Sequence, residues 1–274
     1  MPPKKDALAT IDGNAFPIIA ADSAADALDV VQHNMGDSGL KISDLDRVTV
    51  PTGGGTSFTI PTLEGGEESV DSIVGIIALA PEQKAYWDSS FEDNPNQPPA
   101  CFSSDTRTGQ GNNGDGDGMH QCATCQQNQW GSAAKGTGKA CKDMCQLAII
   151  LPDAFLPTIV AAPRTSLKAK RAYFAKLANK GIPYDGAITK ITLTPTKNEA
   201  GVKYSELSFA LVAILNKEQR QQIRTYAAAL APHMSQPPTV TAAPASDPGD
   251  YDPFAAENQQ DQPPTDAPPF AEAT

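Results

Sequence analysis

All five cysteines of this 274-residue chain lie within a 45-residue window, at Cys101, Cys122, Cys125, Cys141 and Cys145. The middle pair, Cys122 and Cys125, forms a C-x2-C knuckle, the closest spacing with which two thiolates grip one tetrahedral ion. The window is otherwise rich in Gly, Asn, Asp and Gln and poor in core-forming residues. Because packing alone cannot organise such a segment, the window predicts a bound Zn²⁺.

The predicted zinc ligands are the thiolates of Cys101, Cys122, Cys125 and Cys141. Cys141 is preferred to Cys145 because it follows a flexible lead-in at 136–140, whereas Cys145 stands beside an apolar strand and could point into the core. Cys145 and His120 stay open as substitutes, and the alternative interpretation is a set of reduced core cysteines. Four thiolates leave no open coordination position. His120-Gln121-Cys122 also lacks the glutamate that zinc deaminases place before their C-x2-C. The site is predicted to be structural.

No apolar run of the chain is long enough for a transmembrane helix. The two lysines at Lys4 and Lys5 are not followed by an apolar stretch, so the start does not resemble a secretory signal. Clustered cysteines in a protein that is not exported bind metal more often than they form disulfides. The sequence therefore predicts a cytoplasmic protein.

The net charge of −11 is unevenly distributed. From Pro232 to the end there are seven acidic residues and no Lys or Arg, while Lys135 to Lys190 holds ten basic and three acidic residues. A basic middle with an acidic end is a pattern that indicates nucleic-acid interaction.

β-rich runs predict strands at 45–50, 57–60, 69–79, 146–151, 187–194 and 204–215, and helical patterns predict helices at 22–34, 167–178 and 218–230. Gly75 lies inside one strand and favours a bulge there. The order lacks the strand–helix alternation of a parallel sheet. We expect a mainly β fold with a few helices (α+β), built as a small barrel of the oligonucleotide-binding (OB) type with an inserted zinc loop.

Three segments are predicted. Residues 1–40 form an N-terminal segment with one helix, and 41–231 form the OB-like nucleic-acid-binding domain, with the zinc loop at about 98–145. Residues 232–274 are so rich in Pro, Ala, Gln, Asp and Thr that they cannot bury enough apolar surface to fold. This last segment is predicted to be a disordered, acidic tail.

Aromatic and basic residues gather around the cysteines. Single strands are held by aromatic platforms for the bases and by Lys or Arg along the backbone. The candidates for both roles are Lys84, Tyr86, Trp87, Trp130, Lys135, Lys139 and Lys142. The alternative is that the two tryptophans pack over the metal loop and that the lysines are merely solvated. The helix at 167–178, with Lys168, Lys170, Arg171 and Lys176, is the only candidate for reading a duplex and could serve phosphate contacts instead.

No catalytic arrangement is found. The three histidines, His33, His120 and His233, are scattered, and the glycines at 53–55 lack the lysine and helix that a phosphate-binding loop requires. The chain is therefore not predicted to be an enzyme.

The acidic, proline-rich end resembles the C-terminal tip of bacterial single-stranded-DNA-binding proteins. Pro269-Phe270 matches the Pro-Phe of that tip, and Asp261 and Asp266 match its acidity loosely. The resemblance implies that Phe270 and Asp266 bind replication or recombination partners. Residues 271–274 follow the phenylalanine, so the chain departs from a tip in which the terminal carboxylate adjoins the ring.

The middle of the chain resembles a family of phage- and plasmid-encoded proteins over roughly residues 70–215. The resemblance is carried by Ala85-Tyr86-Trp87, Pro98-Pro99-Ala100-Cys101-Phe102-Ser103-Ser104-Asp105, Cys122-Ala123-Thr124-Cys125, Asn128-Gln129-Trp130-Gly131-Ser132 and Gly138-Lys139-Ala140-Cys141-Lys142. Four recurring cysteines of that family match the four predicted ligands, and Cys145 falls outside the pattern. A role in single-stranded DNA binding is our inference for this family.

The sequence thus predicts a zinc-stabilised, non-catalytic single-stranded-DNA-binding protein of phage replication or recombination. Two other interpretations stay open. One is a zinc-containing adaptor or transcription regulator that does not bind single strands, and the other is a subunit of a nuclease or deaminase.

Overall fold

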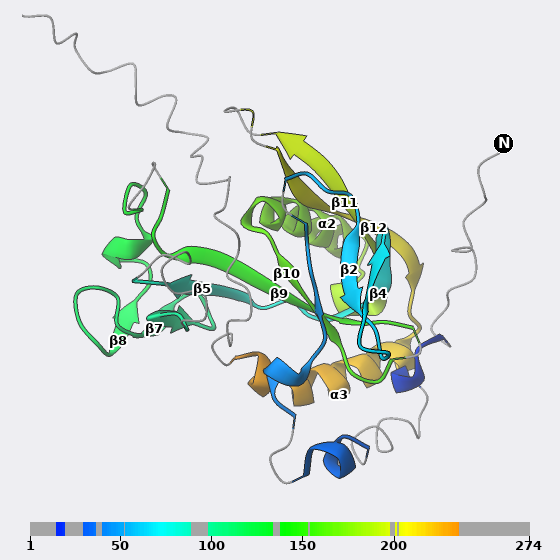
Figure 1. The fold of residues 1–274 in the computed structure, drawn as a ribbon. Coiled ribbons are helices and arrows are strands. Elements are labelled where there is room, and N and C mark those ends of the chain that lie inside the picture. The colour runs from blue at the N-terminus through cyan, green and yellow to red at the C-terminus, as the bar shows by residue number, and fades with distance from the viewer. Residues whose placement is uncertain are drawn as a thin grey trace, which may run out of the picture.

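A computed structural model describes residues 15–19, 30–36, 40–51, 53–88, 98–133, 138–152, 154–197, 201 and 203–235. The fold is mainly β, with one large sheet and a few helices (Figure 1). The predicted start of the first helix and the predicted tail from 236 onward lie outside these residues, while 30–35 are helical as expected. Within the described part of the chain, no helix combines the length and apolarity needed to cross a membrane.

Ten strands form the large sheet, in the hydrogen-bonded order β12-β11-β4-β9-β5-β6-β7-β8, with β10 paired to β9 and β1 paired to β10. The strands are β1 (Arg47–Val48), β4 (Ser72–Leu79), β5 (Glu82–Tyr86), β6 (Cys101–Ser103), β7 (Thr108–Gly111), β8 (Met119–Gln121), β9 (Lys142–Ile150), β10 (Thr158–Ala162), β11 (Ala187–Lys197) and β12 (Lys203–Ile214). A separate hairpin pairs β2 (Phe58–Pro61) with β3 (Glu67–Val70), and a bridge from Thr49 to Thr59 joins it to the end of β1. The sheet is open, since no pairing among the described strands closes it into the ring of a barrel.

Strand β9 is the centre of the sheet. One edge pairs first with β5 and then with β4, and the other edge pairs with β10, all antiparallel. Residues 145–150 are all buried. An apolar strand without alternation is expected where both faces of a sheet are covered.

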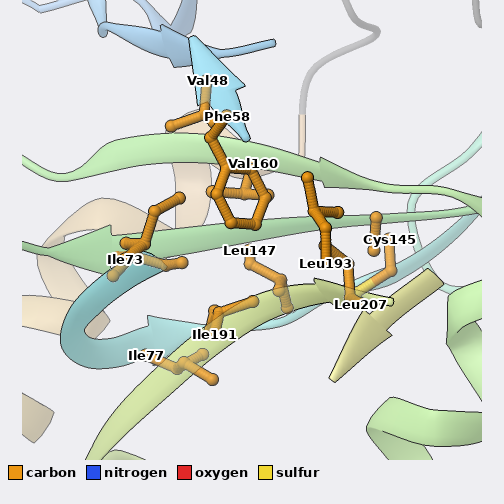
Figure 2. Packing of buried hydrophobic residues seen from close by; sticks show 12 residues of the cluster. Val48, Phe58, Ile73, Ile77, Cys145, Leu147, Val160, Ile191, Leu193 and Leu207 are labelled. Carbon is orange, nitrogen blue, oxygen red and sulfur yellow. The ribbon is translucent and has the colours of Figure 1, made fainter. Parts of the chain in front are cut away.

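Helices α2 (Leu167–Asn179) and α3 (Lys217–Met234) cover opposite faces of β9. Its odd-numbered residues Cys145, Leu147 and Ile149 pack in one cluster with residues from β1, β2, β4, β10, β11 and β12. Figure 2 shows this cluster, with Cys145 and Leu147 among the labelled residues. Helix α2 adds Leu167 and Phe174 to that cluster. The even-numbered Ala148 and Ile150 face α3.

Gly75 allows β9 to approach β4 closely. A Cβ at this position would stand 2.5 Å from the Ile150 carbonyl oxygen, so a side chain there would push the two strands apart. The bulge that we expected at Gly75 lies further along, where the pairing shifts between Ile77 and Leu79.

Helix α3 runs past the predicted end of the folded body at residue 231. It starts with a capping box between Asn216 and Gln219 and continues through Pro232 to Met234. Met234 is buried, and its carbonyl oxygen accepts a hydrogen bond of 2.7 Å from the Gln83 side chain. The proline-rich composition therefore begins inside the last turn of a packed helix, where Pro232 loses one hydrogen bond.

The described part of the chain also contains single 3₁₀ turns. They are η3 (Pro17–Ile19), η5 (Ile42–Asp44), η6 (Gln126–Asn128), η7 (Arg164–Ser166) and η8 (Tyr184–Gly186). Of these, η6 follows the cysteine knuckle and η7 leads into α2.

Candidate functional site

The four predicted ligand cysteines line one small cavity, of about 20 Å³, in the lobe built from β5 to β8. Cys101 starts β6, Cys122 follows β8, Cys125 precedes η6 and Cys141 precedes β9. All are free thiols, and three of them are buried while Cys125 is half-buried. Such a volume is that of a single water molecule or ion.

A glycine lets two of the sulfurs lie close together. A Cβ on Gly109 would stand 2.8 Å from the Cys101 Sγ and 3.7 Å from the Cys122 Sγ. Gly109 lies on β7 opposite His120 of β8. Any side chain at Gly109 would therefore intrude on the sulfur cluster.

The thiols influence one another electrostatically. Burial, followed by the neighbouring Cys122 and Cys125, raises the pKa of Cys101. Burial raises the pKa of Cys141 to about 12, although Lys84 opposes this shift. A metal cation in the cavity would reverse the balance, because a thiol that coordinates a metal releases its proton to solvent and binds as the thiolate.

Hydrogen bonds hold the cysteine segments in place. The Asn113 side chain donates to the Cys125 Sγ at 3.7 Å, and Asn128 Nδ2 donates to the Cys122 carbonyl oxygen at 2.7 Å. The Cys141 amide donates to the Gln127 carbonyl at 2.8 Å. Outer-shell contacts of this kind orient metal ligands in known sites.

The two substitute ligands lie differently. His120 lines the same cavity, with its Nε2 2.9 Å from the Gly111 carbonyl oxygen. Cys145 is 1% exposed and belongs to the main core, as its apolar surroundings indicated. Across the described residues, no three His, Cys, Asp or Glu side chains are already arranged as a group that could hold a metal ion.

A groove of about 570 Å³ adjoins this lobe. Its walls are β5, the start of β9, and the segment from η7 into α2. The lining residues are Glu82, Gln83, Lys84, Thr106, Asp143, Met144, Arg164, Leu167, Lys168 and Arg171. Four of these side chains are cationic and two are carboxylates.

Ion pairs link the opposite charges of the groove at two places. Lys84 pairs with Asp143, and Arg171 lies 3.6 Å from the Glu82 carboxylate while its side chain stays 74% exposed. Arg164, Lys168 and Arg171 come from one wall, at spacings of four and three residues. The wall formed by η7 and α2 is thus basic, and the facing strands carry the two carboxylates.

Trp130 lies where the cysteine lobe meets the groove. The side chain is 46% exposed. The Arg164 guanidinium carbon is 5.1 Å from the centre of its ring, and Lys139 Nζ is 5.3 Å away. Cation–π contacts at these distances are attractive.

The predicted DNA contacts are only partly brought together. Trp130 and Lys139 meet beside the groove, and Lys84 lines both the groove and the cysteine cavity with only 12% of its side chain exposed. Tyr86 lines the cysteine cavity, and Trp87 and Lys142 are half-buried at the ends of β5 and β9. Lys135, Asp266 and Phe270 lie outside the described residues.

Sequence reasoning overlooked Arg164. It lies in a single 3₁₀ turn after Pro163, more than thirty residues from Trp130 in the chain, so no local pattern links the two. Lys168 and Arg171 were recognised as candidate phosphate contacts. Lys170, which was grouped with them, is instead 2% exposed and points into the core.

Comparisons of the chain with protein-family models, curated proteins and solved structures found no match.

Proposed function

We propose that this protein binds single-stranded DNA and acts, without catalysis, in DNA replication or recombination, as a phage-encoded protein would. The observation that carries the proposal is the groove beside Trp130. One wall carries three cations at helical spacing, and the half-exposed Trp130 contacts one of them, Arg164. Phosphates would lie along Arg164, Lys168 and Arg171, and a base would stack near Trp130.

The proposal includes a structural Zn²⁺ held by Cys101, Cys122, Cys125 and Cys141. The donor set favours zinc, since four thiolates form the closed tetrahedral sites of structural zinc proteins. The shared cavity, the side-chain-free Gly109 and the amide groups of Asn113 and Asn128 support the same assignment. The ion would hold the loop that carries Trp130.

The finer architecture is proposed as OB-like. The core cluster draws residues from β1, β2, β4, β9, β10, β11 and β12 around a single interior, which is how a curled sheet encloses a barrel-like core. The binding groove would then lie at the rim of that curled region.

The acidic tail is proposed to recruit replication or recombination proteins through Asp266 and Phe270. The described chain ends at Ser235, next to the hydrogen bond between Met234 and Gln83. Gln83 belongs to β5, which also forms one wall of the groove. A tail without Lys or Arg that starts there would compete with DNA for the basic wall. We place this activity in the cytoplasm of the bacterial host.

Titration with oligo-dT tests the main proposal. Affinity should fall steeply between low and physiological salt as phosphate contacts release counterions, and a duplex of the same length should compete poorly. An Arg164→Ala, Lys168→Ala double variant should lose affinity and show a shallower salt dependence. Protein with stoichiometric zinc that leaves oligo-dT unshifted at low salt would overturn the proposal and favour the adaptor interpretation.

The ligand set predicts which cysteines matter for metal content. Cys125→Ser should lose most of its zinc, because three thiolates and a hydroxyl bind the ion more weakly. Cys145→Ala should keep a full complement, since this thiol lies in the core cluster. Metal analysis of the two purified variants beside wild type measures both, and equal loss from the two variants would contradict the assignment.

A further inference from the structure

Asn128 connects the cysteine cavity to the groove. Its Nδ2 donates to the Cys122 carbonyl, while its Oδ1 accepts from Lys84 Nζ at 3.1 Å and from Lys139 Nζ at 3.5 Å. Lys84 lines both hollows. The cysteine lobe and the floor of the groove therefore share polar contacts.

Trp130 comes shortly after Asn128 in the chain. The turn after it is held to η6 by a 2.9 Å bond from Ser132 Oγ to the Gln127 carbonyl. The Ala140 amide donates to the same hydroxyl at 3.0 Å, next to Cys141. The tryptophan is thus supported on both sides by segments that carry predicted ligand cysteines.

The ring of Trp130 contacts the opposite wall through Arg164. Arg164 starts η7 and lines the groove. This contact joins the cysteine lobe to the wall that supplies the cations. The strength of the contact depends on how firmly the loop that carries Trp130 is held, because this loop supplies the aromatic ring.

The apolar core does not depend on this lobe. None of the four core clusters contains Trp130 or any of the four predicted ligand cysteines. A change in the cysteine centre can therefore alter the position of Trp130 while the strands of the apolar core and helices α2 and α3 stay folded.

We propose that the Trp130–Arg164 contact couples the cysteine metal centre to the DNA groove, so that metal occupancy sets the affinity for single strands. This inference rests on the proposed function. With the ion bound, Trp130 holds Arg164 at the groove wall; after metal loss the contact is released and the groove binds DNA less tightly. Arg164 is here a positioning residue as well as a phosphate contact.

Thermodynamic coupling is reciprocal, which provides a test that needs no DNA. Zinc affinity is measured by competition with a chelator in wild type, Arg164→Ala and Lys168→Ala. The two variants lose the same charge from the same groove wall, but only Arg164 contacts Trp130. A partly exposed cation–π contact corresponds to about a twofold to fivefold change in an equilibrium constant. Arg164→Ala should weaken zinc binding by that factor, and Lys168→Ala should not.

A second arm compares oligo-dT affinity before and after zinc removal. Wild type and Lys168→Ala should each lose affinity on zinc removal, whereas zinc removal should change little in Arg164→Ala. Far-UV circular dichroism should show the fold intact throughout.

The outcomes distinguish the proposed coupling from the proposed function. Equal zinc affinities in the two variants, or protein that takes up no zinc, would overturn the coupling. If wild type leaves oligo-dT unbound, the proposed function fails, and the chelator competition still decides whether Arg164 and the metal centre are linked.

Discussion

Lys170 is a lysine of α2 whose side chain does not lie on the solvent-exposed face of the helix. Its side chain is 2% exposed, and Nζ lies 3.1 Å from the Glu82 carboxylate and 3.3 Å from the Cys145 Sγ. Burial raises the pKa of Cys145, and the ammonium group of Lys170 opposes that rise. Since Lys168 and Arg171 line the groove, consecutive cations of α2 serve separate purposes.

The charge of Lys170 is expected to matter less for stability than its volume. Glu82 is 43% exposed and keeps Arg171 nearby, so removing the ammonium leaves no buried, unpaired carboxylate. Lys170→Met should change the free energy of unfolding by about 1 kcal/mol or less. Lys170→Ala should cost about 2–4 kcal/mol, because it leaves a cavity. Urea denaturation of the two variants distinguishes these effects, and equal losses would show that the ion pair dominates.

At the scale of elements, the close approach of β4 and β9 depends on a missing side chain. At Gly75 a Cβ would meet the Ile150 carbonyl oxygen at 2.5 Å and the Ile149 Cγ2 at 2.6 Å. Neither atom can move freely, since Ile149 and Ile150 belong to the central strand and are buried. The pairing of two long strands is thus set by one position.

Gly75→Ala should destabilise the protein by about 1–3 kcal/mol through overpacking. Gly66→Ala is the matched control, because the nearest atom to a Cβ there, the Thr62 Oγ1, is 3.5 Å away. Denaturant midpoints provide the comparison. Similar midpoints for both variants would mean that the strands separate without cost.

The long apolar elements were predictable, whereas several short strands were not, among them the apolar β10. The strands at β11 and β12 and the helices α2 and α3 were expected within a few residues, because their apolar positions repeat over ten residues or more. β5 was missed because Glu-Gln-Lys-Ala-Tyr reads as polar surface. β6, β7 and β8 were missed because each has only three or four residues within a glycine-rich stretch.

The same distinction applies to the site. A C-x2-C knuckle is a local pattern, so the four cysteines that share a cavity could be chosen from the sequence. The groove joins β5, β9 and η7, which lie far apart in the chain. Only tertiary packing brings these segments together, and no pattern of spacing indicates it.

At the scale of the whole molecule, the last helix of the body continues past residue 231 to Met234, with Ser235 as its C-cap. A chain ending at Ser235 should stay as stable as the full chain and should bind oligo-dT equally well or more tightly. A chain ending at residue 231 loses buried Met234 and its bond to Gln83, and should be less stable by about 2–4 kcal/mol. Thermal unfolding and oligo-dT titration of the two truncations measure both effects. If the chain ending at Ser235 binds oligo-dT more weakly than the full chain, the role assigned to the tail is contradicted.

The antiparallel pairing of β4 with β11 has a consequence for how the chain folds. Ile73 pairs with Ile191 and Ile76 with Ile188, so partners more than one hundred residues apart must meet before the sheet is complete. Sheets that depend on such distant partners fold slowly, on the millisecond-to-second scale. During synthesis on the ribosome, β4 lacks its partner strand β11 until the chain beyond α2 has been made. The unpaired apolar strand is then a point where chaperones would bind the nascent chain.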